Sequence, residues 1–299
     1  MYKSLFLGLL LLLLTGCMQP PSSQPLRISA NLWVGYMPLF YLKERGWLKE
    51  NHIELVNVVS LYENMQMYAI GNVDAFTGTQ YEYHQLLQKH PQLLPVILFD
   101  RSLGGDLVMG NRSIEALRKS GEPIDLYLEV DSVNSELFRA FLRYSGMDEK
   151  RFHVINMDPE MIAKLPMRKH PTLIVTYKPF DTPLRQKGYR VLADTKMPDL
   201  GFEIIDALYI SKADKKRFAK ELQQLNRLIA KALVDLHRDP KTFYDYVKYY
   251  LQGESFDAFQ ESLKSIEWIY GRRDRALRRI LQRVTLPDTD LLEPVRDAI

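Results

Sequence analysis

The stretch LRISANLWVGYMPLFYLKERGWL, residues 26–48, decides how the rest of the chain is interpreted. Apolar and polar residues alternate over 26–32, a period of two that is typical of a β-strand, whereas the apolar residues after Pro38 recur at helical spacing. Between them, Gly35 permits backbone angles that a side chain forbids, and Pro38 suits the first turn of a helix. The sequence therefore predicts a strand, a tight loop and a helix.

The predicted loop brings two aromatic residues, Trp33 and Tyr36, to the start of the helix. Backbone N–H groups at a helix N-terminus have no partner within the helix, so these groups and the two rings together could hold a ligand. An ordinary strand-to-helix turn with aromatic residues in the core explains the same pattern. The residues alone leave both interpretations open, because a fold does not fix a function.

The N-terminal residues predict export. Lys3 precedes an apolar run, Leu5–Leu14, which is too short to span a bilayer permanently and reads as a signal peptide over residues 1–17. Its ending, Leu14-Thr-Gly-Cys17, resembles a bacterial lipobox, which implies lipidation of Cys17 and a lipid anchor at that residue. Cys17 is the only cysteine in 299 residues, so stability must come from the core rather than from disulfides.

Length and composition set the class of protein. Residues 18–25 are rich in proline and serine and predict a tether, and the following residues, in a chain with 46% hydrophobic residues, can bury a large core. The net charge of +3 and the predicted export favour no nucleic-acid partner. We expect a monomer that is anchored by lipid to a membrane and faces the periplasm or the cell surface.

Alternating strands and helices predict two α/β lobes. Strands are expected at 26–32, 53–59, 72–76 and 94–99, and again at 124–130, 152–156, 172–176 and 189–192, each series forming a parallel sheet with helices on both faces. After residue 205 the pattern predicts long helices at 214–237, 240–251, 256–269 and 272–284, with Asp214 as an N-cap. The expected first lobe comprises 26–108 and 196–299, and the second comprises 109–195.

Three segments together carry a resemblance: Gly35–Leu39, Ala69–Ala75 and Asp100–Asp106. With the lipobox, they resemble the solute-binding lipoproteins of ABC importers, in the branch that handles sulfonates, nitrate, taurine and the pyrimidine precursor of thiamine. The resemblance covers about residues 26–210 and implies a type II periplasmic binding fold: two doubly wound lobes with a ligand cleft between them, the C-terminal helices closing the first lobe. Thr176–Phe180 departs from the pattern of the family's second lobe.

Open sheets bind ligands at the carboxyl ends of their strands, so the loops at those ends are expected to line the cleft. The candidate ligand-binding residues on these loops are Trp33, Gly35, Tyr36, Tyr62, Glu63, Asn64, Thr77, Thr79, Glu82, Ser102, Gly104, Asp106, Asp131, Ser132, Asn134, Thr176, Tyr177 and Glu203. Aromatic and acidic residues dominate these loops, with Lys178 as the single basic residue in them. This composition favours a flat nitrogen heterocycle, such as a thiamine-precursor pyrimidine, or an organic amine. Alternatively, the rings pack in the core and free helix ends hold an anion.

No common catalytic or nucleotide-binding motif occurs, and the six histidines are scattered, so we expect neither an enzyme nor a cofactor or metal. A fungal branch of the same superfamily makes the thiamine pyrimidine with a cysteine-rich motif, which a chain with a single cysteine cannot carry. The expected partner is a membrane permease, and a sensory subunit that reports to a membrane receptor remains the alternative. The basic run Arg272–Arg283 is either a solvated helix face or a surface for anionic lipid or an acidic partner.

Overall fold

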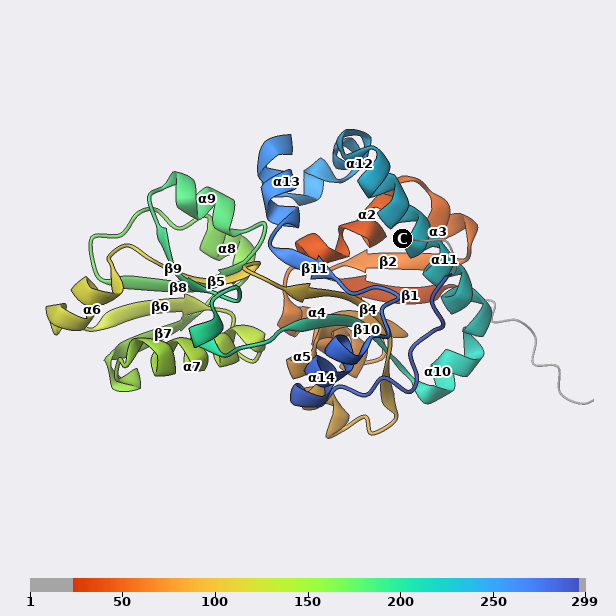
Figure 1. Cartoon of the computed structure of the whole chain (residues 1–299), viewed down its shortest axis with the longest axis horizontal. Coiled ribbons are helices and arrows are strands. Elements are labelled where there is room, and N and C mark those ends of the chain that lie inside the picture. Colours follow the sequence, from red (N-terminus) through yellow and green to blue (C-terminus); the bar gives the residue numbers. More distant parts are fainter. Residues whose placement is uncertain (1–23, 296–299) are drawn as a thin grey trace, which may run out of the picture.

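The structure, a computed structural model, describes residues 24–295 and shows two α/β lobes side by side (Figure 1). The predicted signal peptide, Cys17 and most of the predicted tether lie outside the described residues. In the described part of the chain, no helix has both the length and the apolar character needed to cross a membrane. The predicted architecture of two α/β lobes is confirmed.

The first lobe is built on a six-stranded mixed sheet in the order β11-β4-β10-β3-β1-β2. Strands β1, β2 and β3 are parallel, whereas β10 runs antiparallel to both β3 and β4, and β11 runs antiparallel to β4. The strands are β1 Leu26–Ala30, β2 Ile53–Asn57, β3 Ala75–Thr79, β4 Leu93–Ser102, β10 Ile205–Ser211 and β11 Ile266–Trp268.

The second lobe is built on a five-stranded sheet in the order β7-β6-β8-β5-β9. Strand β6 is parallel to β7 and β8, and β5 is antiparallel to β8 and β9, so this sheet is also mixed. The strands are β5 Asp106–Gly110, β6 Ile124–Leu128, β7 Phe152–Asn156, β8 Thr172–Tyr177 and β9 Arg190–Asp194.

Helices cover both faces of each sheet (Figure 1). The first lobe carries η1 Val34–Tyr36, α2 Met37–Glu44, α3 Trp47–Glu50, α4 Leu61–Ala69, α5 Gln80–Leu87, α10 Lys212–Arg217, α11 Ala219–Arg238, α12 Pro240–Val247, η4 Lys248–Tyr250, α13 Phe256–Leu263 and α14 Arg275–Arg283. The second carries α6 Ile114–Ser120, α7 Val133–Ser145, η2 Glu149–Arg151, α8 Pro159–Ala163, α9 Asp181–Gln186 and η3 Pro198–Leu200.

The C-terminal helices close the first lobe by packing on α2. The Tyr41 ring stacks on Phe243 of α12 with ring centroids 4.4 Å apart, and the Tyr41 hydroxyl donates to Asp235 of α11. Such aromatic pairs contribute about 0.5–1.5 kcal/mol beyond the area they bury. The helix α2, which follows the opening strand, is therefore packed against helices from the C-terminal part of the chain.

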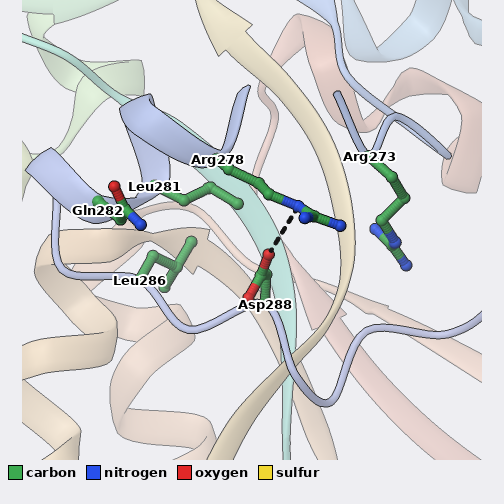
Figure 2. A pocket seen from close by; sticks show the side chains of 6 residues that line it. All are labelled: Arg273, Arg278, Leu281, Gln282, Leu286 and Asp288. Atoms are coloured by element: carbon green, nitrogen blue, oxygen red, sulfur yellow. Dashed lines mark ion pairs between the residues drawn. The ribbon is translucent and has the colours of Figure 1, made fainter. Parts of the chain in front are cut away.

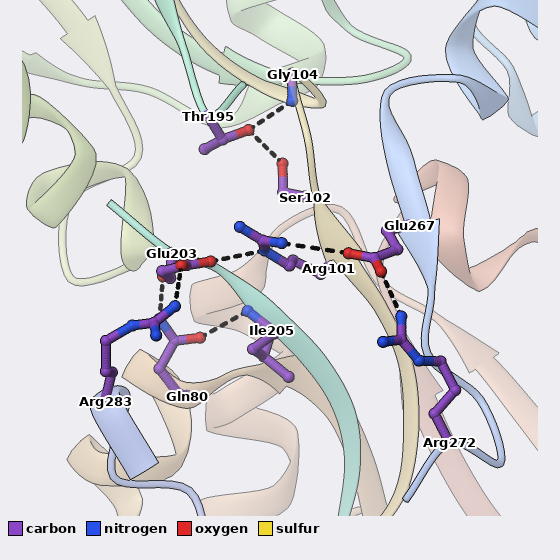
Figure 3. Close-up of polar contacts among 10 residues, drawn as sticks. All are labelled: Gln80, Arg101, Ser102, Gly104, Thr195, Glu203, Ile205, Glu267, Arg272 and Arg283. Atoms are coloured by element: carbon purple, nitrogen blue, oxygen red, sulfur yellow. Dashed lines mark hydrogen bonds and ion pairs between the residues drawn. The ribbon is translucent and has the colours of Figure 1, made fainter. Parts of the chain in front are cut away.

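Two segments connect the lobes, residues 103–105 and residues 195–204. The hydroxyls of Ser102 and Thr195 lie 2.7 Å apart, and the backbone N–H of Gly104 donates to Thr195 Oγ1 at 2.8 Å (Figure 3). The predicted division between residues 108 and 109 falls inside β5, so the chain crosses between the sheets slightly earlier, directly after β4.

The structure contains three strands that the sequence pattern does not indicate, β5, β10 and β11. Strand β10 is buried on both faces at Ile205–Ile210 and therefore shows no alternation of apolar and polar residues. Strand β11 has three residues and is defined by its pairing with β4, a long-range contact that local sequence does not encode. Because β5, β10 and β11 each run antiparallel to a neighbour, the predicted purely parallel sheets are wrong.

The predicted C-terminal helices are shorter or divided in the structure, and the predicted helices 240–251 and 272–284 correspond to α12 with η4 and to α14. The predicted helix 214–237 divides at Phe218 into α10 and α11, and Ser211 rather than Asp214 caps α10, its Oγ accepting from the Asp214 N–H at 3.0 Å. The predicted helix 256–269 ends at Leu263, because the residues that follow pair with β4.

Candidate ligand cleft

Two helix N-termini face each other across the cleft, and each receives a carboxylate from the opposite lobe. Glu129, after β6 of the second lobe, accepts from the N–H of Tyr62 in α4 at 2.5 Å. Glu82, in α5 of the first lobe, accepts from the N–H of Val133 in α7 at 2.9 Å. The partial positive charge of each helix end stabilises these carboxylates. The two contacts are reciprocal and hold the lobes together.

Local sequence fixes both helix ends. Ser60 caps α4 by accepting from the Glu63 N–H, and Ser132 caps α7 by accepting from the Asn134 N–H. Thr79 caps α5 in a capping box, in which Glu82 Oε2 accepts from the Thr79 N–H at 2.9 Å. Such caps each contribute about 1 kcal/mol. Glu82 therefore caps its own helix α5 with Oε2 and the N-terminus of α7 in the second lobe with Oε1.

The predicted aromatic loop is present, but its rings bind carboxylates of the protein. Trp33 Nε1 donates to Asp100 Oδ1 at 3.1 Å, and the Tyr36 hydroxyl donates to Asp206 Oδ1 at 2.5 Å. A Cβ at Gly35 would lie 1.9 Å from Asp100 Oδ2, so only glycine lets the loop approach this closely.

Across the cleft, Tyr177 of β8 meets the first lobe. Its ring lies edge-on to Trp33 with centroids 6.1 Å apart, and its hydroxyl accepts from Asn31 Nδ2 at 3.1 Å. Trp33, Tyr36 and Tyr177 are at most 3% exposed, so both lobes contribute to one closed, buried wall.

Asp100 and Asp206 are functional candidates that sequence analysis missed. They stand opposite each other on the antiparallel strands β4 and β10, and both are buried. Burial raises the pKa of both carboxyl groups well above the usual range, and the neighbouring charge of Asp100 raises the pKa of Asp206 further. The pair therefore favours a shared proton or a bound cation.

Asp106 and Glu129, from the second lobe, complete the acidic lining. Burial, with a smaller contribution from the charge of Glu82, raises the pKa of each to about 7. Burial likewise raises the pKa of Glu82. Among the ion pairs of residues 24–295, none involves these three side chains or the Asp100–Asp206 pair. The cleft thus holds five buried carboxyl groups without a basic partner.

Several buried polar atoms at this interface have no partner in the described structure. They are Asn31 Oδ1, Asn64 Oδ1, Asp106 Oδ2, Glu129 Oε2, Asn134 Oδ1 and Thr176 Oγ1. When the carboxyl groups are ionised, every one of these atoms except the Thr176 hydroxyl oxygen can accept hydrogen bonds but cannot donate them. Because buried polar groups in proteins are normally satisfied, this lining calls for a ligand rich in N–H or O–H donors.

The remaining predicted site residues fall into two groups. Asn64, Thr77, Thr79, Ser102, Ser132 and Thr176 are buried at the carboxyl ends of strands or at the helix starts beside the cleft. By contrast, Glu63 bends back to the Val59 N–H and is exposed, Asp131 is exposed, Gly104 binds Thr195, and Glu203 pairs with Arg101 and Arg283. The structure does not bring these four to the buried cluster.

Two of the four arginines of the basic helix α14, Arg278 and Arg283, form ion pairs, and the helix packs on the first lobe. Leu277 and Leu281 are buried, Arg278 pairs with Asp288 at 3.7 Å, and the face surrounds a pocket of about 410 Å³ (Figure 2). Arg283 and Arg272 pair with Glu203 and Glu267 at the connection between the lobes (Figure 3). The packed helix face is therefore the interpretation that the contacts support.

No group of three or more His, Cys, Asp or Glu side chains within residues 24–295 is placed to hold a metal ion.

No family model and no curated protein sequence matches the chain. Among solved structures, a ligand-binding component of an ABC-type import system from Staphylococcus aureus, with zinc bound, superposes with a TM-score of 0.69 at 16% identity, covering 91% of this chain and 97% of that one. The alkanesulfonate-binding protein SsuA from Xanthomonas axonopodis pv. citri, bound to MOPS, gives 0.66 at 12% identity, with 91% and 100% coverage.

The periplasmic nitrate-binding protein NrtA from Synechocystis PCC 6803 gives a TM-score of 0.63 at 13% identity, covering 82% of this chain and 71% of that one. At these identities the likeness concerns the fold. The chain shares the two-lobed fold of these binding proteins, as its sequence motifs predicted.

Proposed function

We propose that this protein is an extracytoplasmic solute-binding protein that captures a small organic cation between its lobes and delivers it to an ABC importer. The fold supports a binding protein, because the similar structures are described as import or solute-binding components. The lipobox-like Leu14–Cys17 supports an anchor on the membrane that carries the permease. The protein binds its ligand without converting it.

The observation that supports a cationic ligand is the acidic lining of the closed cleft. Five buried carboxyl groups have no basic partner among the described residues, so a bound cation would neutralise charge that the protein leaves unbalanced. The unpaired acceptors Asn31 Oδ1 and Asn134 Oδ1 favour the same kind of ligand, one that donates.

The same geometry disfavours an anion such as a sulfonate or nitrate. Helix N-termini are the usual anion sites of such a cleft, and here Glu129 and Glu82 already accept from the first N–H groups of α4 and α7. An anion would have to displace a carboxylate and then lie among like charges, which costs several kcal/mol at low dielectric.

An amine fits better than a stacked heterocycle. The Tyr36 ring packs edge-on against Phe99 and the Trp33 ring against Tyr177, so these rings already have partners within the protein. Thiamine-precursor pyrimidines stay in the test as the heterocyclic alternative.

A thermal-shift panel tests the proposal. We expect primary amines to raise the melting temperature of the protein with residues 1–17 removed. Thiamine-precursor pyrimidines should raise it less, and taurine, alkanesulfonates and nitrate should leave it unchanged. Asp106→Asn should weaken the stabilisation, whereas Glu149→Gln, which removes an exposed charge away from the cleft, should retain it. Stabilisation by the anions with none by the amines would overturn the proposed ligand class.

A further inference from the structure

Two carboxylate oxygens in the cleft are buried and unpaired, and they lie on different strands. Asp106 opens β5 and Glu129 follows β6, and both residues are at most 4% exposed. Asp106 Oδ2 and Glu129 Oε2 have no hydrogen-bond partner among the described residues. Each oxygen is therefore an acceptor that the described residues leave unsatisfied.

The two oxygens belong to separate subsites. Strand β8 lies between β5 and β6 in the sheet, so the two backbones are two strand spacings, roughly 10 Å, apart. Glu82 raises the pKa of both groups and thus lies within electrostatic reach of both, but its own oxygens already accept from Thr79 and Val133. The oxygens of Glu82 are therefore satisfied, whereas Asp106 and Glu129 each keep one unpaired oxygen.

The strand between the two subsites offers a further unpaired group. Thr176 on β8 is buried, and its Oγ1 has no partner among residues 24–295. Tyr177, the next residue, is within reach of the charges of Glu129 and Asp106, which both contribute to raising the pKa of its phenol. A ligand that runs along the end of β8 would pass both residues.

Glu129 also has a route to the surface. It lines a pocket of about 260 Å³ between the lobes, which includes Tyr62 and Ser60 from the first lobe and Asp131, Asn156 and Asp158 from the second. The Tyr62 side chain is 43% exposed, and an aromatic face beside carboxylates attracts ammonium groups. This pocket gives one ammonium group of a ligand access to Glu129.

Resting on the proposed function, we propose that the ligand carries two separated ammonium groups, one bound by Asp106 and the other by Glu129, as in a short linear diamine. A single ammonium group satisfies one of the two carboxylates and leaves the other buried without a partner. A diamine neutralises both, and its methylene chain lies along Thr176 and Tyr177.

The test compares putrescine and cadaverine with n-butylamine and n-pentylamine, which have the same carbon chains and one charge, by isothermal titration calorimetry. We expect the diamines to bind the unaltered protein at least about tenfold more tightly, because a charge-assisted hydrogen bond contributes this much or more. This comparison requires no variant to fold.

Two variants locate the second charge. Glu129→Gln should bring the diamine affinity to within about twofold of the monoamine affinity and leave the monoamine affinity nearly unchanged. Glu149→Gln, which removes an exposed carboxylate of the second lobe that does not line this pocket, should preserve the preference for diamines.

Equal affinity for monoamines and diamines, or no binding of either diamine, would overturn the two-charge ligand. In the first case the proposed capture of a cation still stands, because the monoamines bind. Binding of taurine or nitrate in place of every amine would instead refute the proposed ligand class itself.

Discussion

Two groups of carboxylates lie a few residues apart in the sequence and differ in their partners. One group pairs with arginines, and the other has no basic partner among the described residues. At the connection between the lobes, Glu203 pairs with Arg101 and Arg283, and Glu267 pairs with Arg101 and Arg272 (Figure 3). In the cleft, Asp100 precedes Arg101 directly on β4 but is buried without a basic partner. Successive residues of a strand point to opposite faces, so one strand serves both regions.

The difference shows where the protein balances its own charge. The two acids at the connection, Glu203 and Glu267, are partly buried, and arginines neutralise both, so neither needs a ligand to balance its charge. The buried acids of the cleft are held by N–H groups, hydroxyls and protons, all of which a cation could replace or supplement. Charge that is left unbalanced at a buried site is costly and points to a binding role.

The largest effect is expected from removing Glu82. Glu82→Ala leaves the N–H groups of Thr79 and Val133 without their acceptor, and each buried unsatisfied donor costs about 1–3 kcal/mol. We therefore expect the free energy of unfolding to fall by roughly 2–5 kcal/mol, measured by urea denaturation. Glu82→Gln, which keeps an acceptor, serves as the control and should cost less. Equal stability of the alanine variant and the unaltered protein would contradict the reciprocal contact.

The second effect concerns pH. Burial raises the pKa of Asp106 and Glu129 to about 7, well above the value in an unfolded chain, so the folded protein holds these protons more tightly. The stability that these groups contribute is fully present below the unfolded pKa and is lost as the pH rises through about 7. The melting temperature of the ligand-free protein should therefore fall between pH 5.5 and pH 8.

A bound cation should reverse this trend, because it favours the ionised carboxylates. Stabilisation by a bound amine should be greater at pH 8 than at pH 5.5, and the double variant Asp106→Asn, Glu129→Gln should flatten the pH dependence of the ligand-free protein. A melting temperature that rises with pH over this range in the absence of ligand would contradict the unpaired cleft acids.

The sequence reveals the fold better than it reveals the cleft. The strand, loop and helix around Gly35 and the caps at Ser60, Thr79 and Ser132 follow from local preferences, and local preferences are visible in a sequence. Asp206 lies in a strand that is buried on both faces, and its partner Asp100 is 106 residues earlier in the chain. Only the antiparallel pairing of β10 with β4 brings the two together, and no local pattern encodes that pairing.

Glu129 is another acid whose place in the cleft the sequence does not reveal. The sequence pattern places it inside the expected strand 124–130, whereas β6 ends at Leu128, and its contact with the Tyr62 N–H depends on how the two lobes close. Conversely, Glu203 looks like a cleft acid from its loop, and the arginines that neutralise it come from β4 and from the C-terminal helix α14. Which acids are paired is a tertiary property, and it decides which acids are open to a ligand.

The smallest effect is expected at the connection between the lobes. Glu203→Gln weakens ion pairs in which Arg101 is 24% exposed and Arg283 is 56% exposed, and such pairs contribute about 0–1 kcal/mol. We expect the free energy of unfolding to change by less than about 1 kcal/mol in dilute buffer, and the change to shrink further in 1 M salt, where charges are screened within about 3 Å. Amine affinity should stay within about twofold, because Glu203 is neutralised by its arginines and lies outside the buried cluster. A loss of amine binding as large as that of Asp106→Asn would mean that the paired and unpaired acids act as one site, and the distinction between the two regions would fail.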